Sequence, residues 1–247
     1  MTGLLDLPVE LLYEVQLHAL SPSLPQVNRH LHIVFSSSPP SFKTQYILRH
    51  VSDCTCLLVT IALRFPICSE HVLDIVLPSQ TPSKDNRPEL PRRLFRNLAP
   101  RELPYSEDDP PLPLLRFLFT DPRVPAPDAN SHLGYALARA VHAEFIPLIR
   151  LLLARGASPR NKSGLAVMIA IRKKKLALVK LLVEREETDE LGRPQRNAKK
   201  RKMGDRVEIT PEMLKTAVKA KARDITEYFM QEKGCIPDIQ TLNLLMR

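Results

Sequence analysis

The sequence predicts an all-α fold, and three observations carry that prediction. Apolar residues recur at steps of three and four through most of the chain, which is the period of a helix buried on one side. A pair of helical segments repeats at a fixed period from Leu133 onward. Prolines, 23 among 247 residues, concentrate between the helical segments, where they end helices. Together these features predict a short N-terminal helical unit followed by a solenoid of helix pairs.

Residues 4–35 are predicted to form a compact helical unit. The pattern starts at Pro8, which suits a first helical position. The apolar residues of the first helix are Leu11, Leu12, Val15 and Ala19, and those of the second are Leu24, Val27, Leu31 and Val34. The second set steps by three, four and three, so we expect it to form one face of a single helix. Prolines at 39 and 40 end this unit.

The middle of the chain is proline-rich. Residues 42–77 read as helical with a break at Pro66, whereas Pro78 to Pro127 holds 12 prolines in 50 residues. Long helices are excluded there, because an internal proline costs about 3 kcal/mol. Short apolar pieces at 94–98 and 112–119 flank an acidic loop at 107–111. The sequence leaves open whether this region packs as degenerate repeats or forms a loose linker.

The repeat period is seen most directly in three alanines. Ala140 and Ala170 are 30 residues apart, and Ala217 follows 47 residues after Ala170, so that the loop before the third copy is longer. Each copy reads as a small-residue helix, a turn and a Leu-rich helix. Gly156 and Gly234 follow the second helix of the first and third copies, where a left-handed residue is favoured. One helix pair cannot bury its apolar face alone, so the copies are expected to stack.

The repeat resembles the ankyrin family over about 115 residues, from Leu133 to the C-terminus. The residues that carry the resemblance are Leu137 to Ala140, Leu151-Leu152-Leu153 and Gly156-Ala157. The chain departs from the family pattern at its T-P-L-H tetrapeptide, which reads Tyr135 to Ala138 and Leu165 to Met168. It also departs at the turn glycine, which is replaced by Glu144 and Lys174. The resemblance implies stacked helix pairs that bind other proteins.

The N-terminal 40 residues resemble an F-box, specifically the short boxes of fungal F-box/ankyrin-type proteins. The resemblance rests on Leu7-Pro8-Val9-Glu10-Leu11-Leu12, Leu20 to Leu24 and Val27 to His32. In that family the box docks on the small Skp-type adaptor of a cullin ubiquitin ligase. By this resemblance the docking residues would be Leu7, Pro8, Leu11, Leu12 and Leu24. The family's aromatic residue near the end of the box is absent. The alternative is that this unit only caps the repeat stack.

The excess of positive charge is local. Arg160 to Arg206 contains fifteen basic and six acidic residues, so its net charge equals the +9 of the whole chain. Part of this charge lies at Arg172 to Lys175, predicted to be an exposed turn between two helices. A second group of basic residues lies in a basic insert at 184–207, whose candidate contact residues are Arg193, Arg196, Lys199, Lys200, Arg201 and Lys202. Three interpretations of such a run stay open: a nuclear import signal, a contact for nucleic acid or another anionic partner, or a solvated loop.

Composition and motif spacing argue against catalysis and against a bound cofactor. With 7 glycines, the chain has no phosphate-binding glycine motif, and no G-x-S-x-G sequence frames a nucleophile. His30 and His32, like Cys54 and Cys56, are spaced by two, which places them on different helix faces and makes a poor metal site. The acidic pairs Asp108-Asp109 and Glu186-Glu187 are expected in solvated loops.

Other features bear on the cellular compartment. No apolar run reaches the roughly 18 residues of a membrane span, and no signal peptide is evident. The four cysteines show no disulfide pattern, so we expect reduced thiols in a cytoplasmic or nuclear protein.

The sequence thus predicts three parts: an F-box-like unit at 1–48, Pro-rich degenerate repeats at 49–131 and ankyrin-like repeats at 132–247. The leading functional hypothesis is a non-catalytic substrate adaptor of a cullin-type (SCF) ubiquitin ligase. Its partners would be a Skp-type adaptor with its cullin complex and an unidentified client protein. An ankyrin-type scaffold without a ligase role, either cytoplasmic or nuclear, is the second hypothesis. An electrostatic nucleic-acid binder that uses the basic insert is the third.

Overall fold

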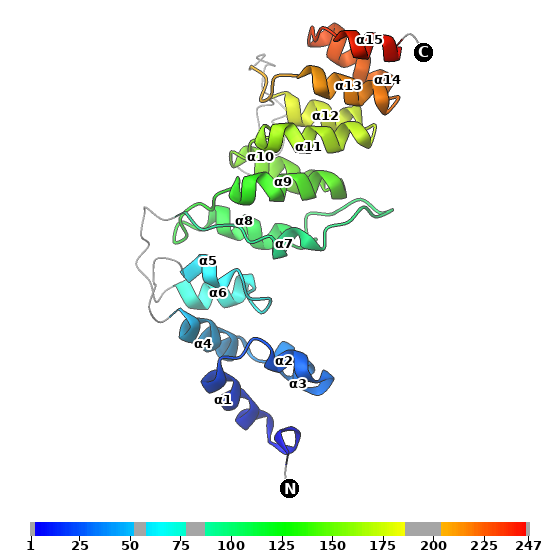
Figure 1. Ribbon diagram of the computed structural model, residues 1–247. Coiled ribbons are helices and arrows are strands. Elements are labelled where there is room, and N and C mark those ends of the chain that lie inside the picture. Colours follow the sequence, from blue (N-terminus) through cyan, green and yellow to red (C-terminus); the bar gives the residue numbers. More distant parts are fainter. Residues whose placement is uncertain (1–2, 52–57, 78–86, 186–203, 246–247) are drawn as a thin grey trace. The chain divides into compact units, whose positions relative to one another are not determined.

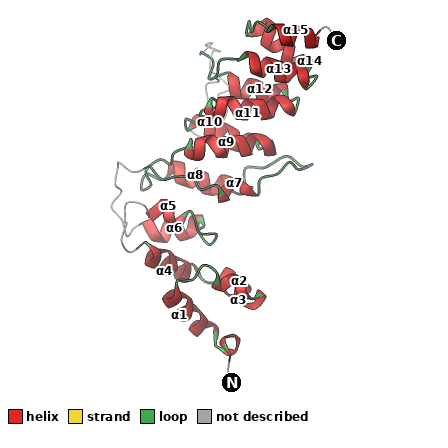
Figure 2. Cartoon of the chain, in the orientation of Figure 1, coloured by secondary structure: helices red, strands yellow, loops and turns green. Residues whose placement is uncertain are grey.

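The computed structural model describes residues 3–51, 58–77, 87–185 and 204–245, and in these ranges the chain is helical without strands (Figures 1 and 2). The predicted all-α fold is therefore confirmed. The chain divides into two compact units: unit 1 comprises Met1–Pro91 and Phe117–Pro127, and unit 2 comprises Arg92–Arg116 and Asp128–Arg247. The three-part division drawn from the sequence stays a prediction.

Unit 1 begins with a short 3-10 turn and continues with α-helices. These are η1 (Leu4–Asp6), α1 (Val9–Ala19), α2 (Leu24–Val27), α3 (Arg29–Ser36), α4 (Pro40–His50), α5 (Leu58–Ala62) and α6 (Glu70–Val76). The break expected at Pro66 falls in the turn between α5 and α6. Helix α4 packs against α1, α5 and α6. This unit follows the helical segments expected from the sequence, with two local differences.

The first difference concerns the second predicted helix, which is broken at Asn28. This residue is extended, with φ −147° and ψ 147°, and its side chain accepts a hydrogen bond from the amide of His30. Asn28 thereby caps α3 and ends the shorter α2, so Leu24, Val27, Leu31 and Val34 do not share one face. Asparagine is a favoured capping residue because its side-chain oxygen satisfies a free helix amide. Val27 is accordingly 73% exposed.

The second difference is smaller and concerns Pro8. It lies one position before the helix, as its N-cap, with φ −54° and ψ 151°. The helix ends at Leu20, whose left-handed conformation (φ 48°) lets its amide reach the carbonyl of Gln16.

Unit 2 consists mostly of paired helices. They are α7 (Arg93–Arg96), α9 (Ser131–Ala143), α10 (Ile146–Ala154), α11 (Asn161–Arg172), α12 (Leu176–Val183), α13 (Pro211–Lys219), α14 (Arg223–Glu227), the π-helical turn η4 (Tyr228–Glu232) and α15 (Ile239–Leu245). Helix α8 (Leu112–Thr120) has its first residues in this unit. The two short apolar pieces expected in the Pro-rich region are thus both helical, as α7 and α8.

The internal repeat is visible in the backbone hydrogen bonds of the turns. The amide of Phe145 donates to the carbonyl of Ala140, at 3.0 Å. The equivalent bonds run from Lys175 to the Ala170 carbonyl and from Ala222 to the Ala217 carbonyl, at 3.3 and 3.1 Å. The three alanines singled out by the sequence therefore occupy the same position in three helix pairs.

The helix pairs pack in chain order. Helix α9 contacts α10 and α11, and α11 contacts α12 and α13. The alanines Ala140, Ala170 and Ala217 are fully buried, as are leucines of the second helices such as Leu152 and Leu182. Small side chains in the first helices allow this close approach. The apolar face of each pair is thus covered by its neighbours, as stacking requires.

The exits of the first and third helix pairs have the expected glycine geometry. Gly156 and Gly234 have φ of 87° and 65°. Just beyond them, the Ala157 amide donates to the Leu152 carbonyl and the Cys235 amide donates to the Phe229 carbonyl, both at 2.9 Å. A left-handed residue at this place lets the chain turn back and satisfy the last carbonyls of the helix.

Candidate interaction surfaces

The predicted docking residues of the N-terminal unit differ in accessibility. Leu11 is 45% exposed, and Pro8 is also exposed. Leu7 and Leu24 are half-buried against the core of the unit. Leu12 is 1% exposed and belongs to that core. The five residues therefore do not form one continuous surface: Pro8 and Leu11 face solvent, whereas Leu12 holds the helix in place.

Helix α1 has an exposed apolar stripe on the side opposite to its buried residues. The stripe comprises Pro8, Leu11, Val15 and Ala19, all of them exposed. Steps of three and four residues bring these positions into line on a helix. Glu10 and Glu14 are also exposed beside the stripe. We call these four residues the α1 stripe. A row of exposed aliphatic side chains rimmed by charge is typical of a surface that binds another protein.

The packing of the buried side of α1 explains why the α1 stripe is exposed to solvent. Leu12, Leu17, Leu31, Val34, Phe35, Phe42 and Tyr46 form one hydrophobic cluster. The ring of Tyr13 packs on that of Phe42, with 4.5 Å between centroids. The Arg49 guanidinium donates to the Leu17 carbonyl at 2.8 Å near the end of α1. The core is filled from the other face of the helix, so Leu11 and Val15 are left outside.

In the F-box pattern an aromatic residue stands at the position of Leu31. In this chain Leu31 is buried there. Phe35 and Phe42 supply aromatic packing to the core instead, with 6.2 Å between ring centroids. The missing aromatic residue of the motif therefore leaves no gap in the buried cluster.

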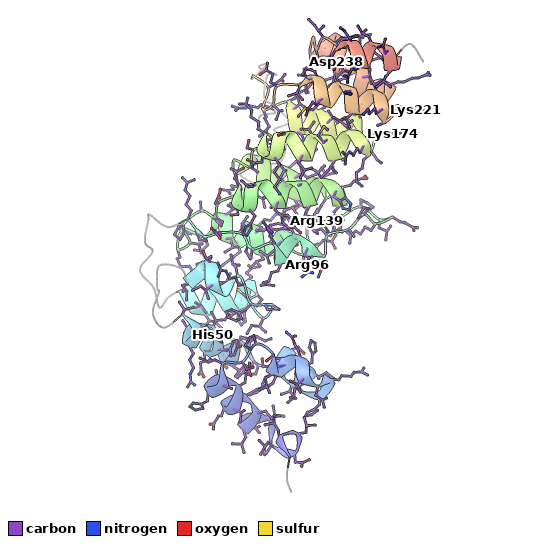
Figure 3. All side chains as sticks on the ribbon, viewed as in Figure 1. His50, Arg96, Arg139, Lys174, Lys221 and Asp238 are labelled. Atoms are coloured by element: carbon purple, nitrogen blue, oxygen red, sulfur yellow. The ribbon has the colours of Figure 1, made fainter. Side chains whose placement is uncertain are left out.

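A second candidate surface lies at the turns between the helices of each pair in unit 2. The left-handed residues of the three turns are Glu144, Lys174 and Lys221, with φ of 60°, 56° and 57°. Arg172, Lys174 and Lys175 are exposed, as expected for this turn from the sequence. The third turn adds Lys219, Lys221 and Arg223, also exposed. Figure 3 shows Lys174 and Lys221 at the same edge of the unit.

Ion pairs neutralise part of this charge. The Glu144 carboxylate lies 2.8 Å from Nζ of Lys173 and 3.5 Å from Nζ of Lys175. The hydrogen bond from Lys173 lowers the pKa of Glu144, so this carboxylate stays charged. The same two cations contribute less to the outer surface, since they face Glu144.

The loop between α7 and α8 is held by Arg101 and Asp109, which form a salt bridge. The Arg101 guanidinium also donates to the carbonyls of Leu103 and Pro104 and lies over the ring of Tyr105, 3.7 Å from its centroid. These contacts leave Leu103 76% exposed. Asp109 of the predicted acidic pair thus has a structural partner in a solvated loop.

The arginine and amide hydrogen bonds to Asp109 lower its pKa to about 2, with the Arg101 contact as the main cause. This carboxylate therefore stays charged at any ordinary pH, and it is not poised for acid–base work.

Helix α9 is connected to the loop after α7 by Arg139. Its guanidinium donates to the carbonyls of Phe95, Arg96 and Leu98, the second of these bonds measuring 2.7 Å (Figure 3). A planar guanidinium suits this role because it presents several donors in a fixed geometry. The connection covers one end of the repeated helix pairs.

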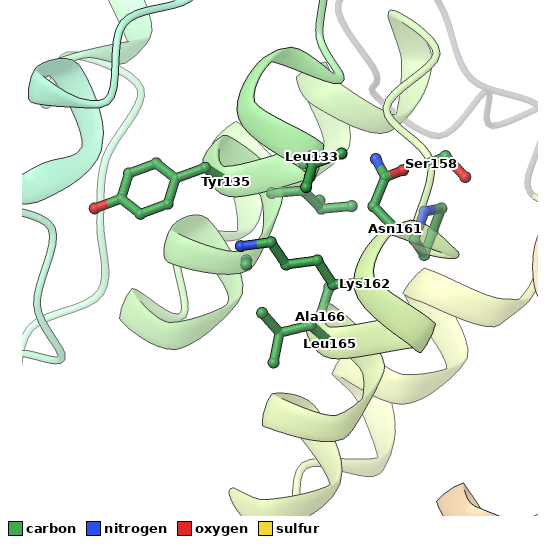
Figure 4. Close-up of a pocket in the computed structure, with 11 residues that line it drawn as sticks. Leu133, Tyr135, Ser158, Asn161, Lys162, Leu165 and Ala166 are labelled. Atoms are coloured by element: carbon green, nitrogen blue, oxygen red, sulfur yellow. The ribbon is translucent and has the colours of Figure 1, made fainter.

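The cavity shown in Figure 4 lies between α9 and α11, beside Tyr135, Asn161 and Leu165. Its volume is about 20 Å³, close to that of a single water molecule in this measure. The described residues contain no cluster of three or more His, Cys, Asp or Glu side chains that could hold a metal ion.

Some candidates from the sequence lie outside the described residues. They are the basic insert residues Arg193, Arg196, Lys199, Lys200, Arg201 and Lys202, the acidic pair Glu186-Glu187, and Cys54 and Cys56. His30 and His32 are exposed on either side of the buried Leu31. Among the helices that the structure does describe, none has the length and apolar character needed to cross a membrane.

Comparison of the chain with protein-family models, with curated proteins and with solved structures gives no match. The F-box and ankyrin resemblances rest therefore on the residues and geometry given above.

Sequence reasoning missed two parts of these surfaces. The exposure of Val15 was not foreseen, although its position four residues from both Leu11 and Ala19 follows from the sequence. The contribution of the third turn was also missed, because the long spacing before Ala217 separates it from Arg172 to Lys175.

Proposed function

We propose that this chain is a non-catalytic adaptor of a cullin-type ubiquitin ligase. The N-terminal unit docks on a Skp-type adaptor through the α1 stripe, and unit 2 binds a client protein. The ligase is then brought to the client, whose lysines meet the charged conjugating enzyme at high effective concentration.

One observation carries the docking step: α1 exposes Pro8, Leu11, Val15 and Ala19 in line while its other side is packed. The stripe includes Pro8 and Leu11 of the F-box-like motif. Apolar side chains in an amphipathic helix favour insertion into a hydrophobic groove of a partner. The structure sharpens the proposal by moving it from Leu12, which is buried, to Leu11 and Val15.

The client-binding step rests on the repeated helix pairs. Stacked pairs of this kind expose one set of turns and one face of the first helices along their length. The turns of unit 2 are exposed and charged, as described above. The proposal assigns client contacts to that surface, while the apolar contacts with the ligase belong to α1.

The test is co-purification of the full chain with a Skp-type adaptor. Wild-type protein should capture the adaptor, and Leu11→Asp should lose at least about tenfold in affinity, because a carboxylate would enter the apolar contact. Ile239→Asp is the matched control, since Ile239 is 78% exposed in unit 2. This variant should capture the adaptor as the wild type does.

Two results would refute the docking proposal. The first is failure of wild-type protein to bind the adaptor. The second is equal capture by Leu11→Asp and wild type. Circular dichroism of each variant checks that loss of capture is not loss of folding.

The alternative is an ankyrin-type interaction scaffold with no ligase role. The repeated helix pairs, with their equivalent turn hydrogen bonds, are compatible with a scaffold as much as with a ligase adaptor role for this chain. A chain that binds clients but not the Skp-type adaptor would support this alternative. For either function, nuclear import is tested by changing Lys199, Lys200, Arg201 and Lys202 to Ala, which should make the protein more cytoplasmic.

A further inference from the structure

We propose that the turns of the second and third helix pairs form a binding surface for an acidic polypeptide segment. The surface consists of Arg172–Lys175 and Lys219–Arg223, which we call the turn ridge. This inference stands whether or not the N-terminal unit docks on a ligase adaptor. It adds the chemistry of the partner, which the sequence motifs leave open.

The two halves of the ridge occupy the same place in consecutive helix pairs. Lys174 and Lys221 both precede the residue whose amide returns to the buried alanine of the first helix. Arg172 and Lys219 both lie two residues after that alanine, at the ends of α11 and α13. Because α11 and α13 pack together, the two turns are neighbours (Figure 3).

The ridge carries a large excess of positive charge. It contains seven basic residues, and Glu144 pairs with two of these, Lys173 and Lys175. Among the residues described by the structure, no acidic side chain pairs with the other five: Arg172, Lys174, Lys219, Lys221 and Arg223. Asp224 is the acidic residue next to the ridge in sequence, and it is exposed at the start of α14. Five exposed cations close together attract an anionic partner.

The two turns also share a backbone feature. Lys174 and Lys221 adopt left-handed conformations, which cost free energy for any residue that has a Cβ atom. Glycine would avoid this cost. Glu144 is the left-handed residue of the first turn, and its side chain makes ion pairs within the chain. Within the described residues no acidic side chain pairs with the two lysines, so their exposed ammonium groups are available to an anionic partner.

The spacing of the ridge suits an extended peptide. Packed helices lie about 8–10 Å apart, and three residues of an extended chain span about 10 Å. An acidic segment of roughly six residues can therefore place carboxylates against both turns at once. Lysine forms good point-charge contacts with such carboxylates.

A nucleic acid is the less suitable partner. Single-stranded nucleic acids are generally bound by aromatic residues that stack on the bases, beside the basic groove. The two turns contain no aromatic residue.

The test compares lysine-to-glycine changes at three left-handed positions in the full chain. Lys174→Gly with Lys221→Gly removes two ridge charges, and Lys162→Gly is the matched control. Lys162 is also exposed and left-handed, with φ 50°, but it lies at the other end of α11. The probe is a labelled peptide of Glu-Glu-Ser units with a length of about nine residues, followed by fluorescence anisotropy at low salt.

We expect the double variant to lose about fivefold in peptide affinity, while its melting temperature stays equal to or above that of the wild type. Lys162→Gly should bind as the wild type does. Lys174→Gln with Lys221→Gln removes the same charges without glycine, and it should show the same loss of affinity.

The basic insert needs its own control because it is also positively charged. When its six candidate contact residues, Arg193, Arg196, Lys199, Lys200, Arg201 and Lys202, are changed to Ala, the ridge substitutions should still lower the peptide affinity about fivefold. If the insert variant loses all binding, or if the ridge variants bind as tightly as the wild type, the proposal is refuted. It is also refuted if single-stranded DNA of equal net charge binds more tightly than the peptide.

Discussion

The α1 stripe and the turn ridge are two exposed surfaces among the described residues, and they differ in chemistry. The stripe is aliphatic and lies on a helix whose other side is buried. The ridge is cationic and lies on turns between helices. Apolar contacts depend little on salt, whereas contacts between exposed charges are screened by it. The two surfaces are therefore suited to partners of different chemistry.

The largest expected effect separates two adjacent leucines. Leu12→Asp should destabilise the N-terminal unit by at least about 4 kcal/mol, because an unpaired carboxylate would replace a core side chain. Leu11→Asp should change stability by no more than about 0.5 kcal/mol. Thermal unfolding followed by circular dichroism measures both changes. Equal destabilisation by the two variants would mean that Leu11 belongs to the core and that the stripe does not exist.

A smaller loss is expected where Arg139 of α9 holds the end of α7 and the residues after it. Arg139→Ala removes the donor to three backbone carbonyls, which should cost about 2 kcal/mol. Arg139→Lys should recover only part of this, because an ammonium group cannot reach three carbonyls in one plane. Urea unfolding gives the comparison. Full recovery with lysine would show that charge alone, rather than the guanidinium geometry, holds this contact.

A substitution at Glu144 tests whether added free charge strengthens binding at the turn ridge. Glu144→Gln removes the partner of Lys173 and Lys175. Because none of these three side chains is buried, the loss in stability should stay below about 1 kcal/mol. The two lysines would then be available to an anionic partner, and affinity for the acidic peptide should rise about twofold. An unchanged or lower affinity would show that Lys173 and Lys175 do not contact the peptide.

The smallest effect is local and depends on pH. The folded-state pKa of Asp109 is lowered to about 2 from the ordinary 3.8. A lowered pKa means that the Arg101 contact stabilises the loop above pH 4 and is lost as the pH falls through about 2. The Ser106 amide, which donates to Asp109 at 2.6 Å, should report this titration by NMR. A midpoint near 4 would contradict the pairing, and Asp109→Asn should abolish the transition.

Much of the fold could be predicted from the sequence because helical spacing and the register of three alanines are local signals. Ala140, Ala170 and Ala217 indeed occupy equivalent positions. The break at Asn28 was missed although asparagine is a known helix cap, because the apolar spacing continued across it. A cap that satisfies a backbone amide here overrides the helical period.

The candidate surfaces were harder to predict for a physical reason. Leu11 and Leu12 are chemically alike, and apolar residues occur on both sides of α1. Only the packing of Phe35, Phe42 and Tyr46 decides which leucine is buried. Likewise the strain at Lys174 and Lys221 depends on backbone angles that spacing does not reveal.

The central claim is that α1 presents an apolar docking surface for a ligase adaptor, and titration calorimetry tests it most directly. Purified full chain and Leu11→Asp are each titrated with a purified Skp-type adaptor at several temperatures. We predict saturable binding by the wild type with a negative heat-capacity change, which is the mark of apolar burial. We predict at least about tenfold weaker binding by Leu11→Asp at unchanged stability. No binding by the wild type, or equal binding by both proteins, would contradict the account.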